Sequence, residues 1–460
     1  MIRSRYEPEG GNITQKDPVG LELRPTRPGG QRGEHKVCSQ SYDCIDYVAL
    51  FKRRARAFWA DVVRFAAGKG PPPSRPFQVE VHARQQGRPA CPNNCIDCCG
   101  RFLRTKRGLP GRILLQLYRD LVDMGVTSVV LSGTHTDPAC LDGRLLSRLI
   151  TMGGPAWGIK LHTFGLNLSR RIQHAIIEAA QADPHRDSYV SFSRLTTDPK
   201  ALRGLCRPRR MSGLQVLRAQ EKTLRSFFTL AAARGFPLSI SLNCRLTRLN
   251  SGLDTLVDLL RWFADHTPPA VQIRMTTDYL PSLAPHGYRE HFFSEIYLPG
   301  DEARRRLARA IDKAALPGPQ RQRIHLRIVP CVPRQDAREC LNGLLLAAVS
   351  AEGLVFPCQS IAGAGFRHLA YGDLRRDRFG HIWSAFIRAL RTGRVKPTWT
   401  NCPHCAAECE RQVCLALAAE AGDLKHELDG PTAPIDVPAM PAWPLMRGQW
   451  VGRIDMRYRQ

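Results

Sequence analysis

The stretch Cys91-Pro92-Asn93-Asn94-Cys95-Ile96-Asp97-Cys98 carries three cysteines in the spacing C-x3-C-x2-C. It follows a predicted short strand at residues 77–81 and leads toward a predicted helix. Cysteines clustered in a large chain without a secretory signal are metal ligands more often than disulfide partners. The spacing therefore predicts a metal or iron–sulfur site directly after the first strand of the main domain.

Two kinds of metal centre compete for this motif. Three cysteine thiolates can bind three irons of a [4Fe-4S] cluster, which leaves the fourth iron open to an outside ligand. A structural zinc ion takes four protein ligands, typically from C-x2-C pairs. Cys99 offers a fourth thiol, but adjacent residues such as Cys98 and Cys99 give poor geometry for one tetrahedral ion. The motif favours the cluster, and zinc is the alternative.

The region after residue 77 alternates strand patterns with helical patterns, which is typical of a parallel α/β domain. Strands are predicted at residues 77–81, 128–131, 159–164, 189–192, 238–242 and 271–275. Helices are predicted at residues 112–124, 141–152, 169–180, 214–233 and 253–265. This order predicts a partial (β/α)6 barrel, in which ligand sites lie at the carboxyl ends of the strands.

Composition shifts divide the chain into five predicted parts. These are a flexible basic arm at 1–36, an N-terminal helical segment at 37–76, the core barrel at 77–300, a small cysteine-rich α+β domain at 301–420, and a Pro-rich tail at 421–460. Within the small domain we expect a charged helix at 301–315 and a strand at 324–329. Cys140, Cys206 and Cys244 lie apart from the cysteine clusters, and we expect them to be small buried side chains.

The C-x3-C-x2-C motif after a strand resembles the signature of the radical S-adenosylmethionine (SAM) superfamily. The resemblance implies a [4Fe-4S] cluster on Cys91, Cys95 and Cys98 whose open iron is chelated by SAM. It further implies that one-electron reduction of the cluster cleaves SAM to methionine and a 5'-deoxyadenosyl radical. Cys99 departs from the family pattern, in which this position is often aromatic or apolar.

Further positions are similar to the SAM-binding places of this family. The segment Ser132-Gly133-Thr134-His135-Thr136-Asp137-Pro138 resembles the Gly-Gly-Glu-Pro segment after the second strand, with Asp137 in place of the glutamate. Polar residues at the ends of the fourth and fifth strands are further candidates for binding SAM. The implied cofactor-binding residues are Ser132, Gly133, Thr134, Asp137, Ser191, Ser193 and Asn243. No catalytic acid or base is singled out.

A second cysteine cluster follows residue 330. It begins with the pattern C-x12-G-x4-C, formed by Cys340, Gly353 and Cys358. The stretch Cys402-Pro-His-Cys405-Ala-Ala-Glu-Cys409 and then Cys414 follow. This order resembles the SPASM domain, a C-terminal extension of many radical SAM enzymes. The resemblance implies one auxiliary [4Fe-4S] cluster on Cys331, Cys340, Cys358 and Cys414 and a second on Cys402, Cys405 and Cys409. The second set has no obvious fourth ligand, so His404 as a ligand, an open iron, a single-cluster "twitch" arrangement and a structural zinc are alternatives.

The formal net charge of +26 arises from 67 Lys and Arg residues that are spread over every segment. No nucleic-acid-binding motif accompanies this charge, so we expect no nucleic-acid partner. We also expect a cytoplasmic enzyme, because the sequence shows neither a membrane-spanning apolar run nor a secretory signal. The expected substrate is a small hydroxylated natural product, or alternatively a ribosomally made peptide, and the expected electron donor is a flavodoxin or ferredoxin.

Overall fold

The protein's computed structural model describes eight continuous segments and several single residues. The segments are 73–88, 107–132, 136–166, 168–206, 211–277, 295–327, 346–356 and 370–391, and the further residues are 58, 61, 70, 71, 91, 93, 95, 96 and 362. Cys98, Gly133, Thr134 and all seven predicted auxiliary-cluster cysteines lie outside these residues.

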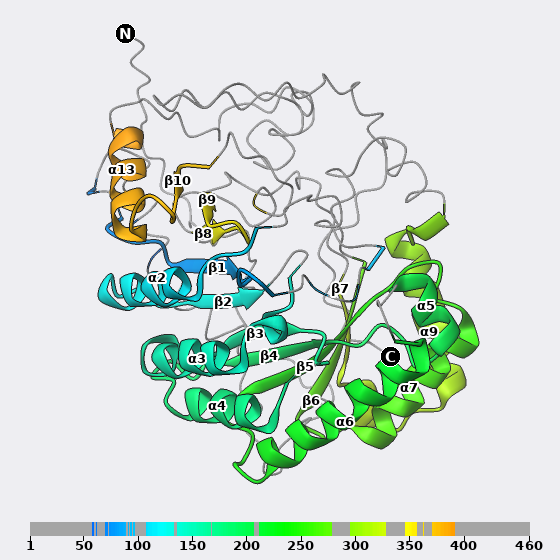
Figure 1. Ribbon diagram of the computed structural model, residues 1–460. Helices are drawn as coiled ribbons and strands as arrows, with labels where there is room; N and C mark the ends of the chain where they lie inside the picture. The colour runs from blue at the N-terminus through cyan, green and yellow to red at the C-terminus, as the bar shows by residue number, and fades with distance from the viewer. Residues whose placement is uncertain are drawn as a thin grey trace, which may run out of the picture.

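A ten-stranded sheet in the order β10-β9-β8-β1-β2-β3-β4-β5-β6-β7 forms the centre of the molecule (Figure 1). Its strands are β1 (Gln78–His82), β2 (Val129–Ser132), β3 (Lys160–Thr163), β4 (Tyr189–Ser193), β5 (Ser239–Arg245), β6 (Val271–Thr276), β7 (Ile324–Arg327), β8 (Leu346–Val349), β9 (Leu354–Phe356) and β10 (Gly372–Asp373). β1 to β7 pair in parallel with their sequence neighbours, and β8 pairs in parallel with β1. β8, β9 and β10 are antiparallel to one another.

Helices follow most of the parallel strands and cover one face of the sheet (Figure 1). They are α2 (Gly111–Asp123), the short 3-10 helix η2 (Pro138–Cys140), α3 (Gly143–Trp157), α4 (Arg170–Gln181), α5 (Pro199–Leu205), α6 (Gly213–Ala232), α7 (Leu253–His266), α9 (Gly300–Ala314), α10 (Gly318–Arg321) and α13 (Phe379–Arg391). Alternate strand residues such as Val81, Leu131 and Leu161 join the helices in one continuous buried core. The residues between them therefore line the opposite face of the sheet, because side chains alternate along a strand.

The structure confirms the predicted fold class of an α/β domain built on a parallel sheet. All six predicted strands of the barrel and the helices between them are present. The strand expected at 324–329 is β7, which pairs with β6 and continues the barrel sheet. The helix α5 (Pro199–Leu205) lay within a segment for which no element was predicted, and Asp198 caps its amino end by accepting a hydrogen bond from the Lys200 amide.

Asp120 links α2 to the start of α13, which are far apart in sequence. Its buried carboxylate accepts hydrogen bonds from the Arg378 guanidinium and from the Phe379 amide at 3.0 Å. We expect Asp120→Ala to destabilise this junction by about 2 kcal/mol, because a buried amide loses its acceptor and a charge pair is lost. Hydrogen exchange measures this effect, and α13 amides should exchange faster in Asp120→Ala than in the isosteric control Asp120→Asn. Equal exchange in both variants would contradict the prediction.

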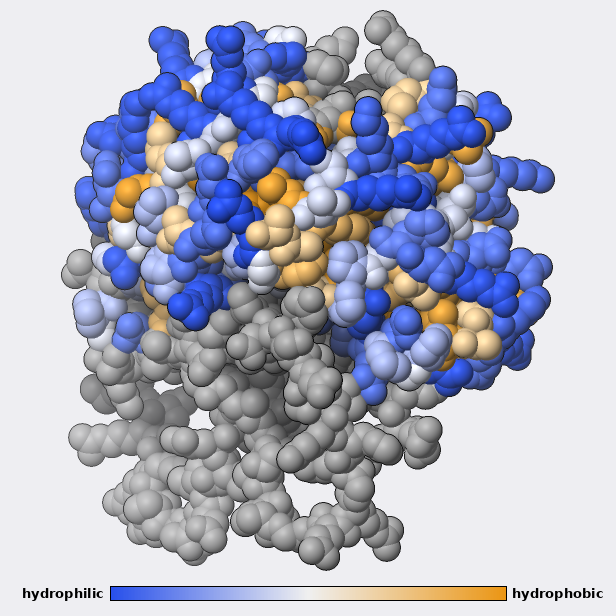
Figure 2. Space-filling model, turned by 90° about the horizontal axis from the view of Figure 1, so that it is seen from below, coloured by the Kyte–Doolittle hydropathy of each residue, from blue (hydrophilic) through white to orange (hydrophobic). Residues whose placement is uncertain are grey.

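The face of the molecule seen in Figure 2 is mostly hydrophilic, with apolar side chains exposed between charged ones. Of the large apolar side chains in the described segments, Leu214, Leu249 and Leu253 are among the most exposed. None of the helices that the structure describes is both long enough and apolar enough to cross a membrane.

Candidate functional site

Cys91 and Cys95 lie in the connection that follows β1, at the carboxyl edge of the parallel strands. Both side chains are half-buried. Residues 95 and 96 run beside the end of α5: Cys95 forms an antiparallel bridge with Cys206, and the Ile96 amide donates to the Leu205 carbonyl at 2.9 Å. The cysteine motif is thus held against the barrel at the edge where ligand sites of such folds lie.

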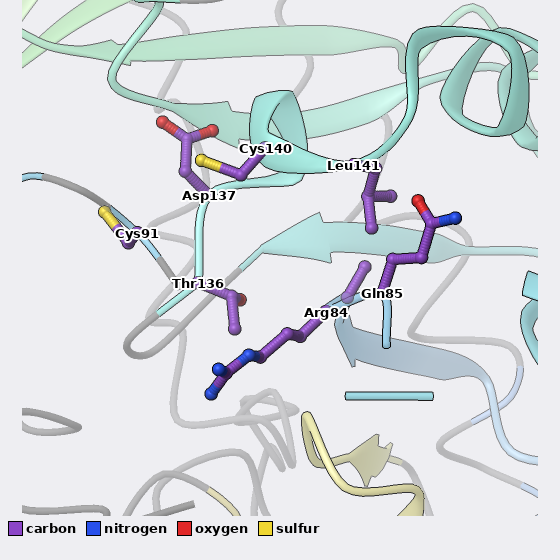
Figure 3. A pocket seen from close by; sticks show the side chains of 8 residues that line it. Arg84, Gln85, Cys91, Thr136, Asp137, Cys140 and Leu141 are labelled. Atoms are coloured by element: carbon purple, nitrogen blue, oxygen red, sulfur yellow. The ribbon is translucent and has the colours of Figure 1, made fainter. Parts of the chain in front are cut away.

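A small pocket lies beside Cys91 (Figure 3). It is lined by Ala83, Arg84, Gln85, Cys91, Thr136, Asp137, Cys140 and Leu141. Cys91, Asp137 and Cys140 gather at one end of this pocket. Burial raises the pKa of the Cys91 thiol well above its usual range, and the negative charges of Asp137, Cys95 and Cys140 raise it further. The ionisable groups of Cys91, Asp137, Cys95 and Cys140 therefore lie close enough for their charges to interact.

Asp137 follows β2 and ties its end to the end of β3. Its Oδ1 accepts hydrogen bonds from the Ala139 amide at 2.9 Å and the Thr163 hydroxyl at 2.7 Å. Its Oδ2 accepts from the Phe164 amide at 2.9 Å. Burial raises the pKa of Asp137, although these three hydrogen bonds act in the opposite direction. The carboxylate therefore fixes the backbone after β2 and at the end of β3, beside the pocket.

The other described SAM-binding candidates lie along the carboxyl halves of β2, β4 and β5. Ser193 lies opposite Asn243 on the neighbouring strand, and Ser191 lies one pleat below, opposite Ser241. Ser132 ends β2. Their strand positions place these four predicted residues on the face of the sheet that does not pack on the helices. Gly133 and Thr134 lie outside the described residues, so their predicted role stays a prediction.

Three shielded polar atoms near this edge find no hydrogen-bond partner within the described part of the chain. They are Asn93 Oδ1 in the cysteine motif, Thr136 Oγ1 in the pocket wall, and Asn243 Oδ1 near the end of β5. A buried polar atom without a partner costs about 1–3 kcal/mol. Such atoms are expected where a polar cofactor or substrate supplies the missing bonds.

A continuous row of polar residues crosses the sheet just below this edge. The pairings align His82 with Ser132, His162 with Ser191, and Ser241 with Gln272, while His162 lies opposite Ser132 because Leu161 pairs with Leu131. The row is therefore His82, Ser132, His162, Ser191, Ser241 and Gln272. A parallel sheet with apolar layers on both faces reads as an apolar run along each strand. This polar row instead indicates a barrel interior built for hydrogen bonding.

Glu80 precedes His82 by two residues on β1, so its side chain lies on the same inner face of the sheet. It is an acidic residue on that face. Its carboxylate lies 3.2 Å from His82 Nε2. Burial by itself would raise the pKa of Glu80, but His82, His162 and the Ser132 hydroxyl lower it overall. His162 Nε2 in turn lies 2.8 Å from the Tyr189 hydroxyl. An ionised acid with two imidazoles can accept or pass a proton at the barrel interior.

Sequence reasoning foresaw the cysteine motif but missed several residues of this site. Cys140 was expected to be a buried structural side chain, whereas it is half-buried and lines the pocket with Cys91. Cys206 and Cys244 are buried, as expected. Glu80 and His82 were not singled out, although the alternation Gln78-Val79-Glu80-Val81-His82 places their side chains on one face.

Among the described residues, no three His, Cys, Asp or Glu side chains form a group that could hold a metal ion. The third predicted ligand, Cys98, lies outside them, as do the auxiliary-cluster ligands. The two described thiols fit a cluster that takes three cysteines: they share one connection, lie at the ligand-binding edge of the sheet and have unpartnered polar atoms close by in the chain.

The sequence matches no protein-family model and no curated protein. Among solved structures, the chain is similar to Streptococcus suis SuiB, with 14% identity, 75% of this chain and 72% of SuiB covered, and a TM-score of 0.47. SuiB has also been solved bound to the precursor peptide SuiA and to S-adenosylmethionine.

The chain is also similar to BtrN in complex with AdoMet and 2-DOIA, with 12% identity, 74% of this chain and 97% of BtrN covered, and a TM-score of 0.30. A third similar structure is Escherichia coli HemN, described as a radical SAM enzyme. It has 16% identity, 56% of this chain and 55% of HemN are covered, and the TM-score is 0.36. These likenesses are of general architecture, and what each protein binds is a property of that protein.

Proposed function

We propose that the chain is a radical SAM enzyme that abstracts a hydrogen atom from a small hydroxylated natural product, with modification of a ribosomally made peptide as the alternative. The C-x3-C-x2-C motif carries this proposal. Cys91 and Cys95 follow β1 at the carboxyl edge of a parallel α/β sheet. Cys91 lines a pocket there, and shielded polar atoms without a described partner lie near the same edge. This placement supports the proposal, because ligand sites of parallel barrel folds lie at the carboxyl ends of the strands.

In this proposal Cys91, Cys95 and Cys98 hold a [4Fe-4S] cluster, and Ser132, Gly133, Thr134, Asp137, Ser191, Ser193 and Asn243 position SAM. When bound, the reduced cluster and SAM would supply a 5'-deoxyadenosyl radical for hydrogen abstraction. The chain's own part is to shape the site: Asp137 fixes the ends of β2 and β3, and the shielded Asn243 Oδ1 offers a hydrogen-bond acceptor. Auxiliary clusters on the second cysteine set, a flavodoxin or ferredoxin donor and a cytoplasmic location belong to the same proposal.

The polar row on the inner face favours the small hydroxylated substrate. Three hydroxyl groups, two imidazoles and the Gln272 amide, one from each of six neighbouring strands, offer closely spaced donors and acceptors. A substrate rich in hydroxyl or amino groups can exchange hydrogen bonds with such a polar lining, whereas an apolar ligand gains no hydrogen bond from it. Glu80 with His82 and His162 offers a base for a hydroxyl proton at the same face.

Anaerobic reconstitution with iron and sulfide tests the proposal. We expect the wild-type chain to form 5'-deoxyadenosine from SAM and dithionite. The Cys91, Cys95 and Cys98 to alanine triple variant should bind about four fewer irons and lose this activity about 100-fold or more. Cys244→Ala, which removes a buried thiol from β5, is the matched control and should keep both. Bound zinc, little iron and no 5'-deoxyadenosine in the wild type would overturn the proposal.

A further inference from the structure

Cys206 is a buried thiol that the proposed chemistry does not use. It ends α5, where its amide donates to the Leu202 carbonyl at 2.7 Å. Its side chain is fully buried in an apolar cluster that includes Ile96, Leu202 and Leu205. The thiol of Cys95 lies beside it, with the two sulfur atoms 3.0 Å apart although the residues are 111 positions apart in sequence.

The backbone holds these two cysteines opposite each other. They form an antiparallel bridge, and the adjacent hydrogen bond from the Ile96 amide to the Leu205 carbonyl fixes the register. Directly opposed residues in an antiparallel pair have Cα atoms about 4.5–5.5 Å apart. Disulfides accept Cα separations of about 4.4–6.8 Å. The pair can therefore become a disulfide with little movement of the main chain.

We propose that Cys206 is a resolving thiol that forms a reversible disulfide with Cys95 when the cluster site is empty and a hydroperoxide is present. The inference rests on the proposed function, in which Cys95 is a cluster ligand. The disulfide removes one of the three ligands and blocks cluster assembly until a thiol reductant restores it. The same bond protects Cys95 from irreversible oxidation.

The reaction balances with hydrogen peroxide as the oxidant. The half-buried Cys95 thiolate attacks one peroxide oxygen, which gives a sulfenic acid and releases water after protonation. The Cys206 thiol then attacks the sulfenic sulfur, so that the S–S bond forms and a second water leaves. The two cysteines lose two electrons and two protons, and one hydrogen peroxide is reduced to two waters. The exposure of the two thiols sets this order, because Cys206 has no contact with solvent.

Disulfide mapping tests the inference without any measurement of catalysis. The iron-free full chain is treated with one equivalent of hydrogen peroxide, alkylated and digested, and the disulfide-linked peptides are sequenced by mass spectrometry. We expect a Cys95–Cys206 link as the main product in the wild type and in the control Cys244→Ser. Cys206→Ser should lack that link and should carry more sulfinic acid at Cys95. Links of Cys95 to other cysteines in place of Cys206, or equal overoxidation in both proteins, would overturn the inference.

Iron uptake separates this inference from the proposed function. The oxidised wild type should take up about four fewer irons than the reduced wild type, because the disulfide blocks only the cluster on Cys91, Cys95 and Cys98, and dithiothreitol should restore uptake. If the chain forms the Cys95–Cys206 link but takes up no iron even when reduced, the proposed cluster is wrong and the disulfide inference stands. If the chain binds iron equally well before and after peroxide treatment and no Cys95–Cys206 link forms, the proposed cluster stands and the disulfide inference is wrong.

Discussion

Asp187→Ala should lower the free energy of unfolding by about 3–5 kcal/mol, because it leaves the Lys160 ammonium buried without its carboxylate. Lys160 Nζ lies 2.6 Å from Asp187 Oδ1, and both side chains are 0% exposed. Lys160 begins β3 and Asp187 precedes β4, so the pair closes the amino end of the barrel, opposite the candidate site. Urea unfolding of the iron-free chain at 25 °C measures the loss.

A variant in which both charges are replaced shows whether Asp187→Ala loses stability through the lost charge pair or through lost packing. Lys160→Met combined with Asp187→Leu removes both charges, and apolar replacement of a buried ion pair is often nearly neutral. We therefore expect the double variant to be more stable than Asp187→Ala alone. If the double variant is the less stable of the two, the charges of the pair do not account for the loss, and packing or the hydrogen bond from Lys160 to the Trp157 carbonyl does.

The alternation of apolar and polar residues made the barrel strands predictable. The helices between them were predictable because apolar residues recur at helical spacing. In the structure Ser212 also caps α6, where its hydroxyl accepts a hydrogen bond from the Gln215 amide. The place of β7 was not predictable in this way. Its alternating sequence Ile324-His-Leu-Arg indicates a strand, but its pairing with β6 depends on contacts across the intervening α9 and α10. Local patterns predict a strand and not its partner.

The residues of the candidate site also fall into two groups, those predictable from a local pattern and those brought together by strand pairing. Cys91 and Cys95 were predicted because their spacing within one short stretch is itself the signal. Glu80 was not predicted: its hydrogen-bond partner His82 lies two residues away on the same strand, but the charge of His162 reaches it only through the register across β2. The contact between Cys95 and Cys206 is of the same kind. Residues that act through long-range pairing leave no local pattern in one sequence.

Asp137→Ala should cost roughly 3–5 kcal/mol of unfolding free energy and should weaken SAM binding. The substitution removes the acceptor of three hydrogen bonds, two of them from buried amides, and each stranded donor costs about 1–3 kcal/mol. Thr163→Val is the matched control, because it removes one of the three donors to Asp137 and keeps both amide donors. It also takes the acceptor from the Gly165 amide, which donates to Thr163 Oγ1 at 3.0 Å, so it should cost about 2 kcal/mol. Urea unfolding of the iron-free chains measures both. Equal costs for the two variants would contradict a central role for the carboxylate.

The same two variants distinguish a direct contact with SAM from control of its position. Both Asp137 oxygens already accept hydrogen bonds from the chain, so we expect the carboxylate to act mainly by fixing the ends of β2 and β3. Both variants should then raise the SAM concentration needed for half-maximal 5'-deoxyadenosine formation, and the rise should be smaller in Thr163→Val than in Asp137→Ala. The iron content should be unchanged in both. If Thr163→Val leaves that concentration unchanged while Asp137→Ala raises it about tenfold, Asp137 binds SAM directly. The bond from Thr163 would then serve stability alone.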